Sequence, residues 1–163
     1  MHRAIEAHLR TRQVGHVIYG AIIGMALVVS LEAHPPGPGV VTATLLATAV
    51  AVGLAELYSE VVGAETRLRR RVGRAQFGQI LDDVAAVAFG IAFPAIFFVL
   101  AAVGVLDGDT AFTIAKWSGL GLISLYGFLA GRLSGQTLWV SLLQALAVGV
   151  IGGILIAFKA LIH

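Results

Sequence analysis

The sequence predicts an all-α integral membrane protein with five transmembrane helices, and three observations support this fold class. Only 12% of the 163 residues are charged, about half the share found in an ordinary soluble domain. The mean hydropathy of the chain is +0.93. The apolar residues also gather in long blocks, and these uncharged runs cover residues 13–31, 33–55, 84–106, 117–131 and 133–158.

Runs of this length suit a bilayer, whose hydrocarbon core is crossed by about 20 residues of helix. Backbone groups in lipid must find their partners within the same segment, which favours helices. We therefore expect a single membrane domain over residues 1–163, with almost no part outside the membrane. The expected spans are 13–33, 40–63, 84–106, 111–131 and 137–160.

Proline and glycine mark the connectors between these spans. The stretch EAHPPGPG at 32–39 contains three prolines, which cannot continue a helix because they lack the amide donor. DGD at 107–109 and GRLSGQ at 131–136 are typical of turns. The basic connector 64–83 is the longest of the four. We expect it to extend the second helix and then to make one short turn.

Two features are expected in the third span. Pro94, in GIAFPAIFF, removes one backbone hydrogen bond and crowds the preceding turn, so it predicts a kink. Asp82 and Asp83 stand where this helix is expected to start. Carboxylates at a helix N-terminus cap free amides and complement the helix dipole. We therefore interpret both aspartates as capping residues.

The basic residues predict the orientation, because cytoplasmic loops of membrane proteins are enriched in Lys and Arg. We expect a multi-pass protein of the cell membrane with its N-terminus in the cytoplasm and its C-terminus outside. Residues 2–12 are expected to form an interfacial amphipathic segment. Of the basic residues, Lys116 and Lys159 fall on the outer side, and the inner side carries Arg3, Arg10, Arg12, Arg67, Arg69, Arg70, Arg71, Arg74 and Arg132.

Pairs of glycines four residues apart occur in three spans. This spacing places both glycines on one helix face, where two backbones can approach closely. Five short helices are few for enclosing a pathway alone, so we expect a homodimer that forms through the first span. Packing within one chain is the simpler interpretation for the other two spans. The pairs are Gly20 and Gly24, Gly127 and Gly131, and Gly149 and Gly153.

Two glutamates near the end of the second span are candidate ion ligands. Glu56 and Glu60 are four residues apart and share one helix face. Glu56 precedes Arg67 by about 16 Å of helix, which places it in the inner leaflet. Carboxylates at this depth usually face a bundle interior or an aqueous cavity. Two interpretations stay open for Glu56: a cation or proton site that opens to the cytoplasm, or a carboxyl group that serves only structure.

Other polar residues are weaker candidates. His16 stands near the cytoplasmic end of the first span, where it either handles a metal or proton or simply lies at the interface. Glu32 and His34 stand at the opposite surface, where they either contact an exiting cation or are solvated. Carboxylates favour hard divalent cations such as Mn²⁺ and Mg²⁺, and histidine shifts the preference toward iron or zinc. A divalent metal is thus a candidate substrate.

Several classes of function are excluded by the sequence. The chain has no cysteine, so it has no disulfide framework, thiolate metal site or cysteine nucleophile. It contains no HExxH motif, phosphate-binding loop or dinucleotide fingerprint. We therefore expect neither an enzyme nor a resident cofactor, and we expect the bilayer rather than a nucleic acid as partner.

The layout resembles the vacuolar iron transporter family, which has five spans and one substantial cytoplasmic connector between the second and third. GLAELYSE (53–60) is similar to the family's GLGEYLS-type stretch, and FPAIFFVLAAVG (93–104) to its proline-containing third helix. GFLAGRLSGQTLWVSLLQALAVGVIGGILIAF (127–158) resembles its last two helices. The resemblance implies a dimer with a metal and proton pathway between the two first helices. It also implies that Glu56 corresponds to the family's membrane glutamate, and that Glu60 begins its cytoplasmic metal collector.

The sequence departs from the family pattern at three places. Ile23, in YGAIIGMAL, occupies the position of the first-helix aspartate. Val52 stands near the position of the expected methionine, so Met25 is the candidate thioether ligand. The collector is short and basic, and its arginines suit anionic lipid headgroups; they are Arg67, Arg69, Arg70, Arg71 and Arg74.

Two functions from different classes follow from these observations. The first is a small homo-oligomeric cation transporter or channel, for a divalent metal or for protons. The second is a non-transporting accessory subunit that docks on a larger membrane protein through its glycine faces. The inner-leaflet Glu56 favours transport, and the missing first-helix aspartate favours the accessory role. The candidate ligands for transport are Glu56, Glu60, His16 and Met25.

Overall fold

The computed structural model describes the backbone of residues 2–162 and the side chains of residues 13–150, 153, 154 and 157. Every regular element within the described backbone is an α-helix, which agrees with the predicted all-α class. The six helices are α1 (His2–Glu32), α2 (Pro38–Leu68), α3 (Arg74–Ala92), α4 (Ala95–Ala102), α5 (Gly108–Leu133) and α6 (Leu138–Ile162).

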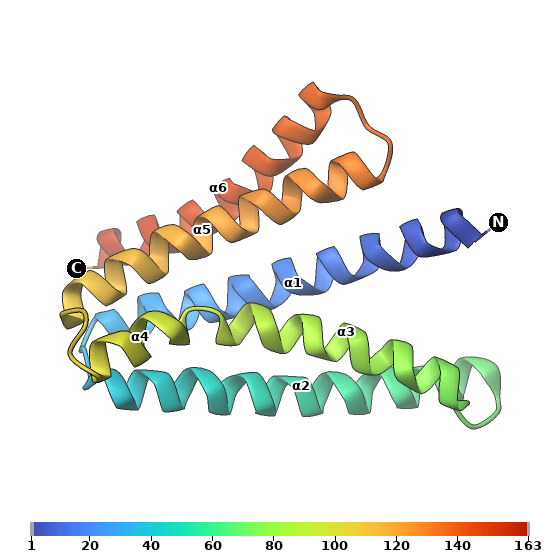
Figure 1. The fold of residues 1–163 in the computed structure, drawn as a ribbon, viewed down its shortest axis with the longest axis horizontal. Helices are drawn as coiled ribbons and strands as arrows, with labels where there is room; N and C mark the ends of the chain where they lie inside the picture. The colour runs from blue at the N-terminus through green and yellow to red at the C-terminus, as the bar shows by residue number, and fades with distance from the viewer. Residues whose placement is uncertain (1, 163) are drawn as a thin grey trace.

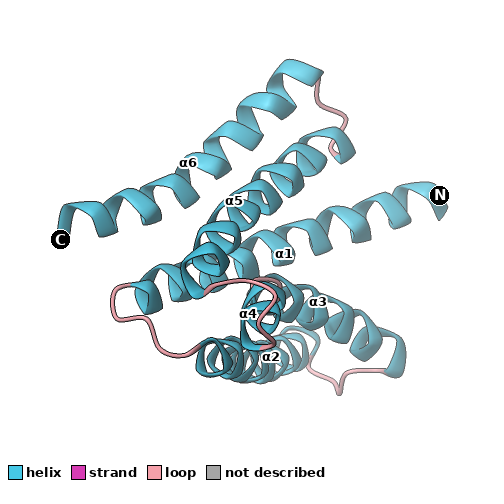
Figure 2. Ribbon diagram, turned by 60° about the vertical axis from the view of Figure 1, so that its left-hand side comes forward, coloured by secondary structure: helices cyan, strands magenta, loops and turns pink. Residues whose placement is uncertain are grey.

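The helices run back and forth along one long axis, with α1 at the centre (Figure 1). Helix α1 packs against α3 on one side and α5 on the other, while α2 packs on α3 and α4, and α6 packs mainly on α5. Apart from the break between α3 and α4, the connecting loops lie at the two ends of the bundle (Figure 1, Figure 2). The N-terminus and the α2–α3 and α5–α6 connectors share one end, so the exposed arginines of both connectors gather there.

Three helices are long and apolar enough to cross a membrane: residues Gln13–Glu32 of α1, then α2 and α5. The number rises to four if α3 and α4 are counted together as one broken span. The expected fifth span, 137–160, corresponds to α6, in which the described residues give a shorter apolar segment, Leu138–Val150. Large apolar side chains lie exposed along the outer faces, as expected for helices that contact lipid; they include Val50, Leu54, Leu143 and Leu146.

The segment 64–83 extends the second helix and then makes a short turn, as expected, but the third helix starts earlier than predicted. Helix α2 continues to Leu68 and ends where Arg69 adopts the left-handed conformation, with a φ of 50°. Helix α3 then begins at Arg74, directly after the extended residue Gly73. The interpretation of Asp82 and Asp83 as capping residues is therefore wrong, since both lie two turns inside α3. The helix tolerates both charged residues in its interior and begins two turns earlier, at Arg74.

The predicted kink at Pro94 is confirmed. Helix α3 ends at Ala92 and α4 starts at Ala95, and their axes differ in direction by 46°. Pro94 lies fully buried between them. Its ring offers no amide hydrogen, so the α-helical ladder is interrupted at this point.

Glycines set the close crossing of α1 and α3. A methyl group added at Gly90 of α3 would lie 2.5 Å from the Val17 carbonyl oxygen, and one added at Gly24 of α1 would lie 2.8 Å from that of Ile91. One added at Gly20 would collide with the Val87 carbonyl oxygen. The Gly20–Gly24 face, expected to join two copies, is therefore occupied within the chain.

Glycines of the last two helices also pack inside the chain, as the simpler interpretation predicted. A methyl group at Gly131 of α5 would lie 2.7 Å from the Ser141 hydroxyl, and one at Gly149 of α6 would lie 2.8 Å from that of Ser124. A methyl group added at Gly153, in contrast, would have no atom within 4 Å among the described residues.

Candidate functional site

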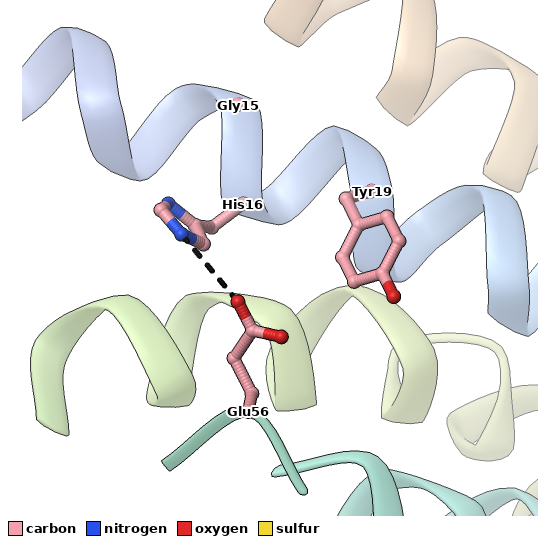
Figure 3. A pocket seen from close by; sticks show the side chains of 4 residues that line it. All are labelled: Gly15, His16, Tyr19 and Glu56. Carbon is pink, nitrogen blue, oxygen red and sulfur yellow. Dashed lines mark ion pairs between the residues drawn. The ribbon is translucent and has the colours of Figure 1, made fainter. Parts of the chain in front are cut away.

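A pocket of about 320 Å³ lies between α1 and α2 near the arginine-bearing end (Figure 3). It is lined by Gly15, His16 and Tyr19 of α1 and by Glu56 of α2. Gly15 leaves room there because it has no side chain. Helix α3 packs against both α1 and α2. The Glu56 side chain of α2 extends past α3 toward His16 of α1 (Figure 3).

Glu56 and His16 face each other in this pocket. His16 Nε2 lies 4.0 Å from Glu56 Oε1, and their side chains are 17% and 24% exposed. This separation is that of an ion pair rather than a direct hydrogen bond. Gly53, one turn before Glu56, is buried where α2 packs on α3, and a methyl group added there would be in ordinary contact with Val84 Cγ1 at 3.4 Å. Two sequence-predicted candidates are thus brought together.

Asp83 of α3 completes the cluster on the other side of the ring. His16 Nδ1 lies 3.8 Å from Asp83 Oδ1, and the Asp83 side chain is only 6% exposed. Sequence reasoning missed Asp83 as a site residue because the start of α3 was misplaced. A signal was present, since Asp83 shares the helical spacing of the buried residues Ile80, Val87 and Gly90. That spacing places it on the apolar face, where a carboxylate needs a partner.

The site lies well inside the bundle. Glu56 precedes the end of α2 at Leu68 by about 18 Å, and Asp83 follows the start of α3 at Arg74 by about 14 Å, at 1.5 Å per residue. His16 lies at the beginning of the apolar segment Gln13–Glu32. Three helices therefore place two carboxylates and one imidazole at a similar depth, where they can bind a cation or exchange protons.

Glu60 does not join this cluster. It lines a separate surface pocket of about 440 Å³, one helical turn closer to the arginine end, together with Ser59, Gly63, Thr66 and Arg67. The predicted pairing of Glu56 and Glu60 in one ligand set is thus not seen in the structure.

Met25 also lies away from the pocket. Its side chain is 1% exposed and packs in an apolar cluster with Ala21, Val29 and Ile123. The candidate thioether ligand is therefore part of the hydrophobic core between α1 and α5.

Glu32 and His34 lie at the opposite end of the bundle. Glu32 Oε1 accepts a hydrogen bond from Lys116 Nζ of α5 at 2.6 Å. His34 is exposed in the loop after α1. Glu32 thus forms an interhelical ion pair, and the structure gives no contact between these two residues and the Glu56 pocket.

The described residues contain no group of three or more His, Asp or Glu side chains arranged to hold a metal ion. The basic cluster of the connector lies beyond the pocket at the same end of the molecule. All five of its arginines are exposed: Arg67, Arg69, Arg70, Arg71 and Arg74.

Comparison of the chain with known protein families, with characterised proteins and with solved structures gave no match. The class that the structure defines is an all-helical protein with three or four helices able to cross a membrane. Its distinguishing feature is a cluster of two carboxylates and one imidazole between three helices.

Proposed function

We propose that this protein is a small homo-oligomeric transporter or channel that moves cations across the cell membrane. The observation that carries the proposal is the meeting of Glu56 and His16, from two different helices, in a pocket flanked by apolar helices. The resemblance to the vacuolar iron transporter family points in the same direction, with iron or manganese as candidate substrates.

Physical chemistry supports a functional role for this pocket. An ionisable side chain at membrane depth costs at least a few kcal/mol, and such residues usually pair or line an ion pathway. The pocket of about 320 Å³ has room for several water molecules. The partly exposed Glu56 can therefore exchange ions with water that enters from the arginine end.

The distribution of charge supports the proposed orientation. The exposed arginines of the α2–α3 connector and Arg132 lie at one end of the bundle, which the positive-inside rule assigns to the cytoplasm. There they suit anionic lipid headgroups. Since Gly20 and Gly24 pack against α3, a contact between copies would use another face, such as the α1 face with the half-exposed Tyr19.

Ion flux into proteoliposomes of the purified protein tests the proposal. Flux of Mn²⁺, Fe²⁺, Mg²⁺ and H⁺ is measured for the wild type and for Glu56→Gln. We expect flux of at least one cation in the wild type and a loss of tenfold or more in Glu56→Gln. Glu60→Gln is the matched control, because Glu60 lies on the same helix outside the pocket. Absence of all flux in vesicles that hold folded protein would refute transport by this chain alone.

The second candidate function is an accessory subunit of a larger membrane complex. It is supported by the five exposed connector arginines, which form a basic surface for a lipid or an acidic protein segment. Under this proposal the vesicles show no flux. Charge reversal of Arg70 and Arg71 then removes binding of the protein to its membrane partner, as measured by co-purification from the native membrane.

A further inference from the structure

We propose that His16 passes a proton between Glu56 and Asp83, so that the ion handled at this site is the proton. The inference rests on the proposed function, since it takes Glu56 as the water-accessible end of the pathway. It adds Asp83 as the buried end, and it assigns His16 as the carrier between the two carboxylates.

The geometry of the imidazole carries this inference. The two ring nitrogens face two different carboxylates: Nε2 faces Glu56 at 4.0 Å, and Nδ1 faces Asp83 at 3.8 Å. A neutral imidazole holds one N–H donor and one acceptor nitrogen. The ring can therefore accept a proton on one side and release another on the opposite side.

The proton transfer uses only the two carboxyl groups and the imidazole of this site. The O–H bond of protonated Glu56 breaks as an N–H bond forms at Nε2 of His16. The N–H bond at Nδ1 then breaks as an O–H bond forms on the Asp83 carboxylate. One proton thus passes from Glu56 to Asp83, and the ring is left as its other tautomer. Return of a proton or rotation of the ring restores the starting state.

The difference in burial indicates the side from which a proton enters. The Glu56 side chain is 24% exposed and lines the pocket, whereas the Asp83 side chain is 6% exposed. His16 lies between them at 17% exposure. A proton that enters from pocket water meets Glu56 first, and the ring then offers it a route from Glu56 to Asp83.

The distances require a small adjustment. Proton transfer needs a donor and acceptor within about 2.6–3.2 Å or one bridging water, and both separations here are longer. The pocket at Glu56 offers room for such a water. On the Asp83 side, a small rotation of the imidazole toward the carboxylate would shorten the contact.

The same geometry favours a proton over a divalent metal. The two carboxylates face different nitrogens of one ring. Among the described side chains, an ion at Nε2 would therefore meet Glu56 and His16, and an ion at Nδ1 would meet Asp83 and His16. Zinc sites take four ligands and calcium or magnesium sites about six. A proton needs only one acceptor at a time.

Among the described side chains, other titratable groups near His16 come from the helices packed around it. Tyr19 of α1 lines the same pocket. Glu60 of α2 lies one turn away in its own pocket. Asp82 of α3 and Tyr126 of α5 line a separate groove of about 600 Å³ with Gln13. Asp82 is therefore a matched control for Asp83, as an adjacent aspartate on the same helix that lines a different pocket.

Time-resolved infrared spectroscopy after a drop in pH tests the relay on the purified protein. The C=O bands of protonated Glu56 and Asp83 are assigned by their loss in Glu56→Gln and Asp83→Asn. We expect the Asp83 band to rise at least tenfold more slowly in His16→Gln, while the Glu56 band rises as in the wild type. Asp82→Asn should leave both bands and both rates unchanged. His16→Asn is the second variant if His16→Gln does not fold.

Two infrared outcomes would overturn the inference: an Asp83 band whose rate does not depend on His16, or no band that Asp83→Asn removes. Flux then separates this inference from the proposed function. Suppose that metal flux depends on Glu56, is unchanged in Asp83→Asn and is not accompanied by H⁺ movement. This result rejects the relay and leaves cation transport intact. If no ion flux is detected but the infrared rates are as expected, transport is rejected and the proton exchange is supported.

Discussion

Glu32 at the end of α1 and Lys116 of α5 form an ion pair in which Nζ lies 2.6 Å from Oε1. The two residues are 84 positions apart in the sequence, and their side chains are only 23% and 20% exposed. The pair lies at the end of the bundle opposite to His16. It therefore fastens α1 to α5 far from the candidate site.

Replacing Lys116 by Met should destabilise the protein without abolishing flux. The partly buried Glu32 carboxylate would lose its ion pair with Lys116, at a cost of about 1–3 kcal/mol, between the values for exposed and buried pairs. Thermal unfolding in detergent measures the change. A double-mutant cycle with Glu32→Gln isolates the pair, and a coupling energy near zero would contradict the structural role.

Gly90→Ala should destabilise the α1–α3 crossing. The added methyl group would lie 2.5 Å from both the Val17 carbonyl oxygen and the Ala21 amide nitrogen, which are backbone atoms that cannot move aside alone. Overpacking of this kind costs about 1–3 kcal/mol or more. Gly78→Ala in the same helix is the control, because nothing lies within 4 Å of its added methyl group among the described residues. Equal melting temperatures for the two variants would argue against the close crossing.

Met25→Leu should leave both stability and flux nearly unchanged. Met25 packs in the core rather than in the Glu56 pocket, and a volume-conserving apolar exchange usually costs less than about 1.5 kcal/mol. Flux in proteoliposomes and thermal unfolding measure the two effects. A selective loss of metal flux in a stable variant would instead support a thioether ligand.

Asp107 should make the start of α5 sensitive to acid. Its carboxylate accepts hydrogen bonds from the Thr110 hydroxyl at 2.7 Å and the Thr110 amide at 2.8 Å. These bonds, the hydroxyl first, lower the pKa of Asp107 below its ordinary value of 3.8. Because the folded state has the lower pKa, this stabilisation is present above about pH 5 and is lost as the pH falls through the folded pKa.

Melting temperatures measured between pH 3 and pH 7 test this expectation. Asp107→Asn should remove a small part of the acid-induced decrease, since an asparagine still caps the helix but does not titrate. Asp109→Asn, in the first turn of the same helix, serves as the control. An identical pH profile for wild type and Asp107→Asn would contradict the assignment.

Much of the fold could be predicted from the sequence because the signals were local. The prolines of 32–39, DGD (107–109) and GRLSGQ (131–136) each fall where a helix meets a connector: between α1 and α2, at the start of α5 and at the end of α5. Pro94 breaks its helix as expected. The start of α3 could not be predicted, because residues 74–83 are helical without an apolar run that would reveal them.

The candidate site was predicted only in part. Glu56 and His16 were candidates from their types and depth, and the structure brings them together. Glu60 and Met25 were candidates too, but Glu60 lies one helical turn further along α2 in another pocket, and the rotation of α1 places Met25 in the core. Asp83 was not a candidate because the expected start of α3 placed it at a helix end rather than inside the helix.

The sequence by itself determined the helical class, the two ends of the bundle and the segregation of arginine to one of them. These properties depend on hydropathy, proline and charge, which act within a few residues of the chain. The tertiary structure alone decided that His16, Glu56 and Asp83 meet, and that Gly20 and Gly24 face α3. Those contacts depend on where the helices cross and on how each helix is rotated about its axis. At the α1–α3 crossing, glycines on two separate helices allow the close approach.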